Sequence, residues 1–279
     1  PHYIEWKPAD GFSREFRTHE KFAKRLYYGL YPVWWLFHQW DIFIANQLKP
    51  EWNLGFDTMT FYPDADAEST SVDGQAGENQ LVGTWADLVA GAGDESDDSA
   101  TSISFRVENN ATQFQKLLRM FMLFDTSGIN DGAIISSATL SLFGLNKQDD
   151  NGDTPDLNIY SSAPASNTAI VSGDFDSVGS TAFSTAVTYA GWSTVAYNDF
   201  VLNASGLANI TKTGVSKFSG RNANYDVANS APGTGVGVQV MKIGAVSADN
   251  AGTTNDPKLV VVYSGVSTSP SVSPSLSPS

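Results

Sequence analysis

The chain has 279 residues, 41% of them hydrophobic, and a formal net charge of -14 at pH 7, a balance typical of a folded globular protein. It contains no cysteine, which excludes disulfide scaffolds, thiolate metal sites and cysteine nucleophiles. The negative charge lies mainly beyond residue 50 and repels phosphate backbones, so we expect no nucleic-acid partner.

Residues 1–56 are predicted to form an aromatic, helical docking segment. Ser13 can cap a first helix, Pro32 ends or kinks it, and a second, apolar helix follows to about Leu48. Polar residues interrupt the apolar run, so a membrane span is disfavoured, and an interfacial helix remains an alternative. Burial against the same or a neighbouring chain is the favoured interpretation. The predicted assembly contact comprises Trp34, Trp35 and Trp40.

Residues 57–264 change character to short alternating or apolar runs between turn signals rich in Gly, Asn and Asp, such as VDGQ at 72–75. This pattern predicts a mainly β fold, an antiparallel jelly-roll β-sandwich. In RMFMLFDTSGINDGAIISSATLSLFG, residues 119–144, two core strands flank a polar turn where Asp125 and Ser127 can bond to the local backbone. The expected core includes Leu118, Phe121, Leu123, Leu140, Leu142, Val260 and Val262.

Residues 265–279 read GVSTSPSVSPSLSPS. Serine and proline at this density cannot bury enough surface to fold, and proline favours an extended backbone. We therefore predict a Ser/Pro-rich linker or stalk after the sandwich.

No catalytic residues are predicted. All three histidines precede residue 57, so no Ser-His-Asp triad lies wholly within the sandwich. Aspartates are plentiful there, but turn chemistry explains most of them better than paired catalytic carboxylates do. The chain is therefore expected not to be an enzyme.

One loop has the spacing of a cation site. NKQDDNGDTPD, residues 146–156, places Asp149, Asn151 and Asp153 at alternate positions, as in short Ca²⁺-binding loops. It lacks the glycine and the distant glutamate of the helix-loop-helix site. A solvated turn is favoured, structural Ca²⁺ is the alternative, and no other cofactor is expected.

Three aromatic residues in polar stretches are candidate sugar-binding platforms: Trp85, Trp192 and Tyr225. Rings in such positions can stack on sugar faces. The competing interpretation, which the composition favours, places them in the core or at the edge of the sandwich.

The stretch RMFMLFDTSGINDGAIISSATLSLFG resembles the central signature of the DNRLRE-type, carbohydrate-binding-module-like jelly-roll domains. TFYPDADAESTSVDG resembles their opening, and DPKLVVVYS, residues 256–264, resembles their final strand. The resemblance covers about residues 58–264. Such domains occur in secreted and cell-surface bacterial proteins, and similar ones occur in tailed-phage virion proteins.

This resemblance, with the aromatic segment before the sandwich and the Ser-Pro repeats after it, implies a structural virion protein of a tailed phage. It would be a decoration, neck, fibre or adhesion subunit of the virion, with other virion subunits as partners, a homo-oligomeric state and a host-surface glycan as a candidate ligand. The alternative is a carbohydrate-binding or adhesive module of a secreted bacterial cell-surface protein.

Overall fold

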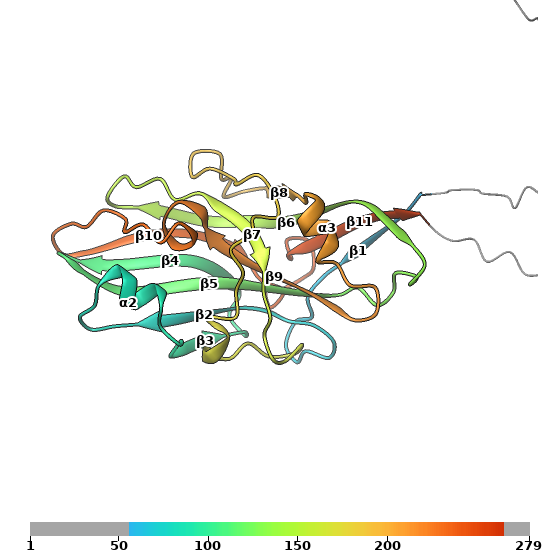
Figure 1. Ribbon diagram of the computed structural model, residues 1–279, viewed down its shortest axis with the longest axis horizontal. Coiled ribbons are helices and arrows are strands. Elements are labelled where there is room, and N and C mark those ends of the chain that lie inside the picture. Colours follow the sequence, from blue (N-terminus) through green and yellow to red (C-terminus); the bar gives the residue numbers. More distant parts are fainter. Residues whose placement is uncertain (1–55, 265–279) are drawn as a thin grey trace, which may run out of the picture. The chain divides into compact units, whose positions relative to one another are not determined.

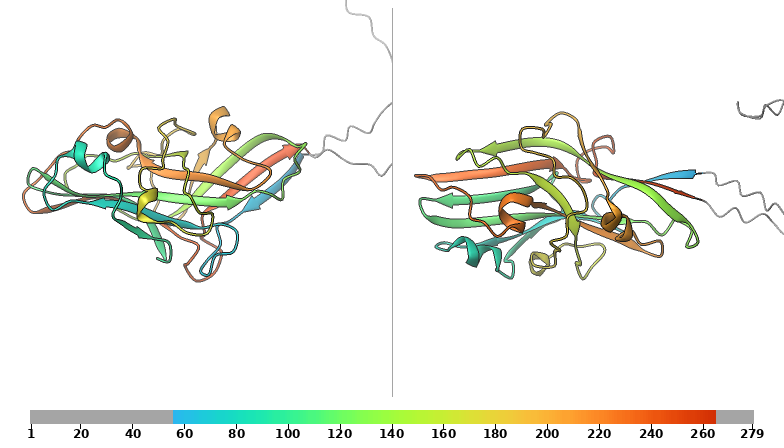
Figure 2. Two further views of the ribbon diagram at one scale, coloured as in Figure 1. Left: turned by 60° about the horizontal axis from the view of Figure 1, so that its bottom comes forward. Right: turned by 45° about the horizontal axis from the view of Figure 1, so that its top comes forward.

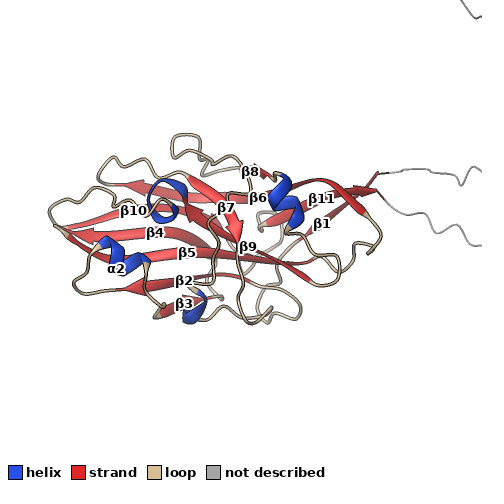
Figure 3. Cartoon of the chain, in the orientation of Figure 1, coloured by secondary structure: helices blue, strands red, loops and turns tan. Residues whose placement is uncertain are grey.

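The computed structural model describes residues 56–264, which we call the β-domain, and strands form most of its regular structure (Figures 1 and 3). The strands are β1 (Phe56–Phe61), β2 (Asp73–Asn79), β3 (Glu95–Asp97), β4 (Ser102–Asn110), β5 (Gln113–Asp125), β6 (Ile134–Asp149), β7 (Leu157–Ser161), β8 (Tyr197–Val201), β9 (Val215–Asn222), β10 (Val238–Val246) and β11 (Lys258–Ser264). Short helical turns are α2 (Trp85–Val89), η2 (Ser172–Asp174), α3 (Ala204–Ala208) and η3 (Ala223–Val227).

The strands pair antiparallel, and several pairs are nested along the chain. β1 pairs with β11, β4 with β10, β5 with β9, and β6 with β8. The innermost pairs therefore join neighbouring parts of the sequence, whereas the outermost pair joins the two ends of the β-domain. The predicted mainly β, antiparallel fold is confirmed.

Two long strands, β5 and β6, each change partner along their length. The first part of β6 pairs with β11 and β8, and its last part, from Gly144, pairs with β10. Gly144 lies at a close approach of two chain segments, because a Cβ there would meet the backbone oxygen of Ser193 at 1.8 Å. β5 likewise pairs first with β4 and then with β9. The result is a β-sandwich-like arrangement around one apolar core.

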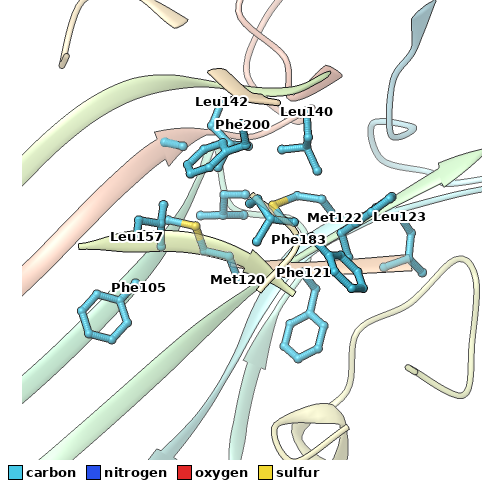
Figure 4. Packing of buried hydrophobic residues seen from close by; sticks show 14 of the residues in the cluster. Phe105, Met120, Phe121, Met122, Leu123, Leu140, Leu142, Leu157, Phe183 and Phe200 are labelled. Atoms are coloured by element: carbon cyan, nitrogen blue, oxygen red, sulfur yellow. The ribbon is translucent and has the colours of Figure 1, made fainter. Parts of the chain in front are cut away.

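The core lies between side chains of β6 and β8 on one side and β5 and β7 on the other (Figure 4). Leu140, Leu142 and Phe200 lie opposite Met120 and Leu157 in this view, and all five are fully buried. Five predicted core residues are confirmed as buried: Leu118, Phe121, Leu123, Leu140 and Leu142.

The prediction for the last strand is wrong by one residue. Val260 and Val262 are only half-buried, whereas Leu259, Val261 and Tyr263 fill the core. Successive residues of a strand face opposite sides. KLVVVYS is apolar at consecutive positions, so its composition does not show which side faces inward.

The polar turn between β5 and β6 is confirmed in detail, since the Ser127 amide donates to Asp125 Oδ1 at 3.0 Å. The structure adds that the two strands have different partners: β5 pairs with β4, β2 and β9, and β6 with β11, β10 and β8. The expected turn at VDGQ is wrong, because Asp73 to Gln75 belong to β2. The predicted helices and tail lie outside the described residues.

Candidate functional site

Two of the three predicted sugar-stacking rings are core residues. Trp85 is 5% exposed and packs edge-on against Phe114, with ring centroids 5.2 Å apart. Trp192 is 2% exposed and belongs to the same apolar cluster. Neither ring offers a face to a ligand in this structure, so the expectation that they are stacking platforms is corrected in favour of the core interpretation.

The third ring, Tyr225 in η3, is half-buried and holds a loop in place. Its hydroxyl donates to the backbone oxygen of Asp153 at 2.6 Å. Burial, together with the negative charges of Asp153, Asp149 and Asp156, raises the pKa of Tyr225. The residue is accessible in part, but its polar end is already engaged.

In the loop predicted as a turn or a Ca²⁺ site, the side chains form hydrogen bonds with nearby backbone groups. Asp149 accepts from the amides of Asp153 at 2.9 Å and Thr154 at 2.8 Å. Asn151 donates to the Gly233 oxygen, and Asp153 accepts from the Gly233 amide. These bonds are those of a polar turn, so the geometry favours the solvated-turn interpretation. Trp34, Trp35 and Trp40 lie outside the described residues.

A different set of polar side chains comes together on one face of the sheet formed by β2, β3, β4 and β5. In antiparallel strands, directly paired residues point to the same face. Glu108 therefore lies beside Lys116, which pairs on its other side with Asn79. The next rows contain Arg106 with Leu118, Gly77 and Glu95, and Gln75 with Asp97.

These rows form two adjoining hollows of about 250 and 330 Å³, which share Lys116 and which we call the polar trough. Except for Leu81 and Leu118, the residues that line the described trough are polar: Gln75, Asn79, Gln80, Asp94, Glu95, Ser96, Asp97, Arg106, Glu108, Gln115 and Lys116. The opposite face of β4 carries Ile103, Phe105 and Val107 into the core.

Charges of both signs alternate in the polar trough. Arg106 pairs with Glu108, and Lys116 Nζ lies 2.9 Å from a carboxylate oxygen of Glu95. Burial and the charge of Arg106 lower the pKa of Lys242, which pairs with Arg106 from β10. Partly exposed ion pairs of this kind contribute only about 0–1 kcal/mol, so a ligand can replace them at little cost.

The polar trough also contains an unused donor. Arg106 Nε is buried and has no hydrogen-bond partner among residues 56–264. With amides, carboxylates and cations in two adjoining hollows, the surface can bind a hydroxyl-rich ligand through hydrogen bonds. Sequence reasoning missed it, although the alternation in ISFRVE, residues 103–108, marks one apolar and one polar face.

No protein-family model matches the chain, and no curated protein is significantly similar to it. Within the part of the chain that the structure describes, no helix is long and apolar enough to cross a membrane. Function is therefore inferred from the residues and geometry of the β-domain, because a fold alone does not determine function.

Proposed function

We propose that this chain is a non-enzymatic structural protein of a tailed-phage virion, a decoration, neck, fibre or adhesion subunit, which displays the β-domain as a jelly-roll sandwich. The nested strand pairs support the jelly roll, since they are what results when one long antiparallel hairpin folds around a core. The aromatic segment before the β-domain, predicted as residues 1–56, is proposed to dock on other virion subunits.

The observation that carries this proposal is the position of the two ends of the β-domain. Phe56 pairs directly with Ser264, so the segments before and after the β-domain are attached at the same end (Figure 1). The turn between β4 and β5 lies at the other end in this view. Attachment at one end leaves the polar trough free to face outward from a particle.

The alternative function is a carbohydrate-binding or adhesive module of a secreted bacterial cell-surface protein. The polar trough favours it, because amide and charged side chains suit hydrogen bonding to sugar hydroxyls. The same surface serves the virion proposal if the glycan belongs to the host. The two proposals therefore differ in location rather than in ligand.

The place where the chain is found distinguishes the virion proposal from the cell-surface proposal. Phage particles purified from a culture that produces this chain are analysed by mass spectrometry and labelled with an antibody fragment raised against the β-domain. We expect the chain in the particles and the antibody on their outer surface. Recovery of the chain only from the bacterial surface would establish the alternative, and recovery only from the cytoplasm would contradict both.

Glycan binding is measured separately, with the full chain on an array of host-surface glycans. Arg106→Ala and Lys116→Ala change the polar trough, and Lys258→Ala on β11 is the matched control. We expect binding that the first two substitutions weaken and the control leaves unchanged. Binding that all three variants retain would show that the trough is not the contact surface.

A further inference from the structure

A further hollow, separate from the polar trough, lies between two loops that are far apart in the sequence. The loop after β1, residues 62–72, faces the loop before β11, residues 247–257, as Figure 2 shows for the blue and red loops. They line an open hollow of about 670 Å³ that we call the acidic hollow, whose lining includes Asp64, Asp249 and Asp256. The Asp66 amide donates to Asp249 Oδ1 at 2.7 Å and joins the two loops.

Three carboxylates gather where these loops meet. Oxygens of Asp66, Glu68 and Asp249 all lie within 4.8 Å of one another. Glu68 Oε1 is buried and accepts no hydrogen bond from the described residues. No salt bridge within residues 56–264 reaches any of the three, although like charges this close repel.

Asp256 lines the acidic hollow together with Asp249, the member of the three carboxylates that also lines it. It is 3% exposed, and its Oδ1 is buried without a partner in the described part of the chain. A carboxylate is rarely buried unless it is paired or binds a metal. Burial and the neighbouring charge of Asp249 raise the pKa of Asp256 to about 6. Asp256 therefore adds a further carboxyl group beside Asp249 on the wall of the hollow.

Behind the loop lies one more acidic residue. Asp73 at the start of β2 is 1% exposed and accepts from the Ala248 amide at 3.2 Å. Burial, and to a smaller extent the charges of Asp249 and Asp256, raise the pKa of Asp73. Acidic side chains thus lie on both sides of residues 248 and 249, and burial favours the neutral form of Asp73.

We propose that Asp66, Glu68 and Asp249 bind a divalent cation, with Asp256 as a further carboxylate on the wall of the hollow. The geometry points to Ca²⁺. The donors are carboxylate oxygens on two irregular loops, and Ca²⁺ accepts about 6–8 oxygens in flexible geometry, whereas Mg²⁺ demands a near-ideal octahedron. Zn²⁺ and later transition metals favour histidine and cysteine, and residues 57–264 contain neither.

A cation at this position would join the chain entering β2 to the chain entering β11. It would therefore stabilise the outermost strands of the β-domain, and its role is independent of the polar trough. The site also differs from the loop of Asp149, Asn151 and Asp153, in which each of the three side chains makes at least one hydrogen bond to the backbone.

Calorimetric titration of the full chain with CaCl2, after removal of metal with EDTA, tests the proposal. We expect binding of one ion, at least 10-fold weaker in Glu68→Gln and in Asp249→Asn, because each substitution removes one charged ligand while keeping the side-chain shape. Asp153→Asn in the other acidic loop is the matched control and should bind as the wild type does. Mg²⁺ should bind more weakly than Ca²⁺.

Absence of Ca²⁺ binding by the wild type would overturn the proposal. So would binding that Asp153→Asn abolishes and Glu68→Gln leaves intact, because the ion would then occupy the loop near residue 150. Circular dichroism spectra establish that each variant is folded. If Asp249→Asn does not fold, Glu68→Gln decides the result, since Glu68 Oε1 makes no hydrogen bond within the β-domain.

Discussion

Asp226 connects two buried arginines on neighbouring strands. Arg119 of β5 and Arg221 of β9 each donate two hydrogen bonds to its carboxylate, at distances between 2.6 and 3.0 Å. The remaining donors of the arginines bond to the backbone oxygens of Phe175, Val89 and Gly179. Burial opposes ionisation of Asp226, but the charge of Arg119 and the hydrogen bonds from both arginines hold its pKa below the ordinary value.

We expect Asp226→Asn to lower the free energy of unfolding by about 3–5 kcal/mol, because it leaves two buried guanidinium groups without a counter-charge. Urea unfolding followed by circular dichroism measures the change. Asp125→Asn is the control, since asparagine can keep the bond to the Ser127 amide, and it should cost less than about 0.5 kcal/mol. A loss below about 1 kcal/mol for Asp226→Asn would contradict this account.

The raised pKa of Asp256 predicts that this residue makes the folded protein less stable as the pH rises. The lowered pKa of Asp226 predicts the opposite effect. Free aspartate titrates near 3.9, and Asp256 titrates at about 6 in the folded protein because of burial and the charge of Asp249. Between these values the folded state holds a proton that the unfolded state has lost. The free energy of unfolding contributed by this group therefore falls as the pH rises.

Asp256→Asn cannot titrate, so its stability relative to the wild type should rise from pH 4 to pH 7 in EDTA. Denaturant unfolding of both proteins at several pH values measures this difference. The substitution also removes the charge through which Asp256 raises the pKa of Asp73, so the difference reports Asp256 together with this coupling. A stability difference that stays constant with pH would show that the residue carries its charge without penalty.

At the scale of elements, the strand pairing of β11 shows which of its residues face the core, which its uniformly apolar composition does not. Val260 and Val262 pair with Thr60 and Thr58 of β1 on one side and with Thr139 and Ser137 of β6 on the other. Directly paired residues share a face, so these valines lie on a face of small polar residues. Their neighbour Val261 is fully buried.

Val261 and Val262 therefore allow the same substitution to be compared on the two faces of β11. We expect Val261→Ala to cost about 1.5–3 kcal/mol, because it removes two buried methyl groups worth about 0.8 kcal/mol each and leaves a cavity, and Val262→Ala to cost clearly less. Thermal or urea unfolding of the two variants compares identical chemical changes on opposite faces. Equal losses would mean that β11 does not have the facing described here.

β2 and β9 are strands that composition did not predict. DGQAGEN reads as a turn because of its glycines and polar residues, yet it lies between β5 and β3. A Cβ at Gly77 would approach Leu118 Cδ2 to 2.3 Å. The side chains of Leu118 and Glu95 occupy the space beside Gly77, a packing that only the tertiary structure reveals. Strands such as β5 were predictable, because a long apolar run indicates a buried strand.

At the scale of the molecule, the sequence predicted a mainly β, antiparallel fold but not the strand order. Short strands and polar turns are local features, whereas pairs such as β1 with β11 join residues about two hundred positions apart. The acidic hollow was missed for the same reason. PDADAE and SADN are ordinary loop sequences, and only the long-range pairing of β1 with β11 brings Glu68 close to Asp249.

The last prediction concerns the independence of the β-domain. Its apolar cluster extends from Phe61 to Tyr263, and its first and last strands close on each other through Phe56 and Ser264. Residues 56–264 alone should therefore fold into a soluble monomer with the strand-rich circular dichroism spectrum of the full chain. If residues 1–55 are the docking segment, the full chain should form oligomers that the shortened chain does not. Light scattering coupled to gel filtration compares the two, and oligomers of equal size would show that the subunit contact lies on the β-domain itself.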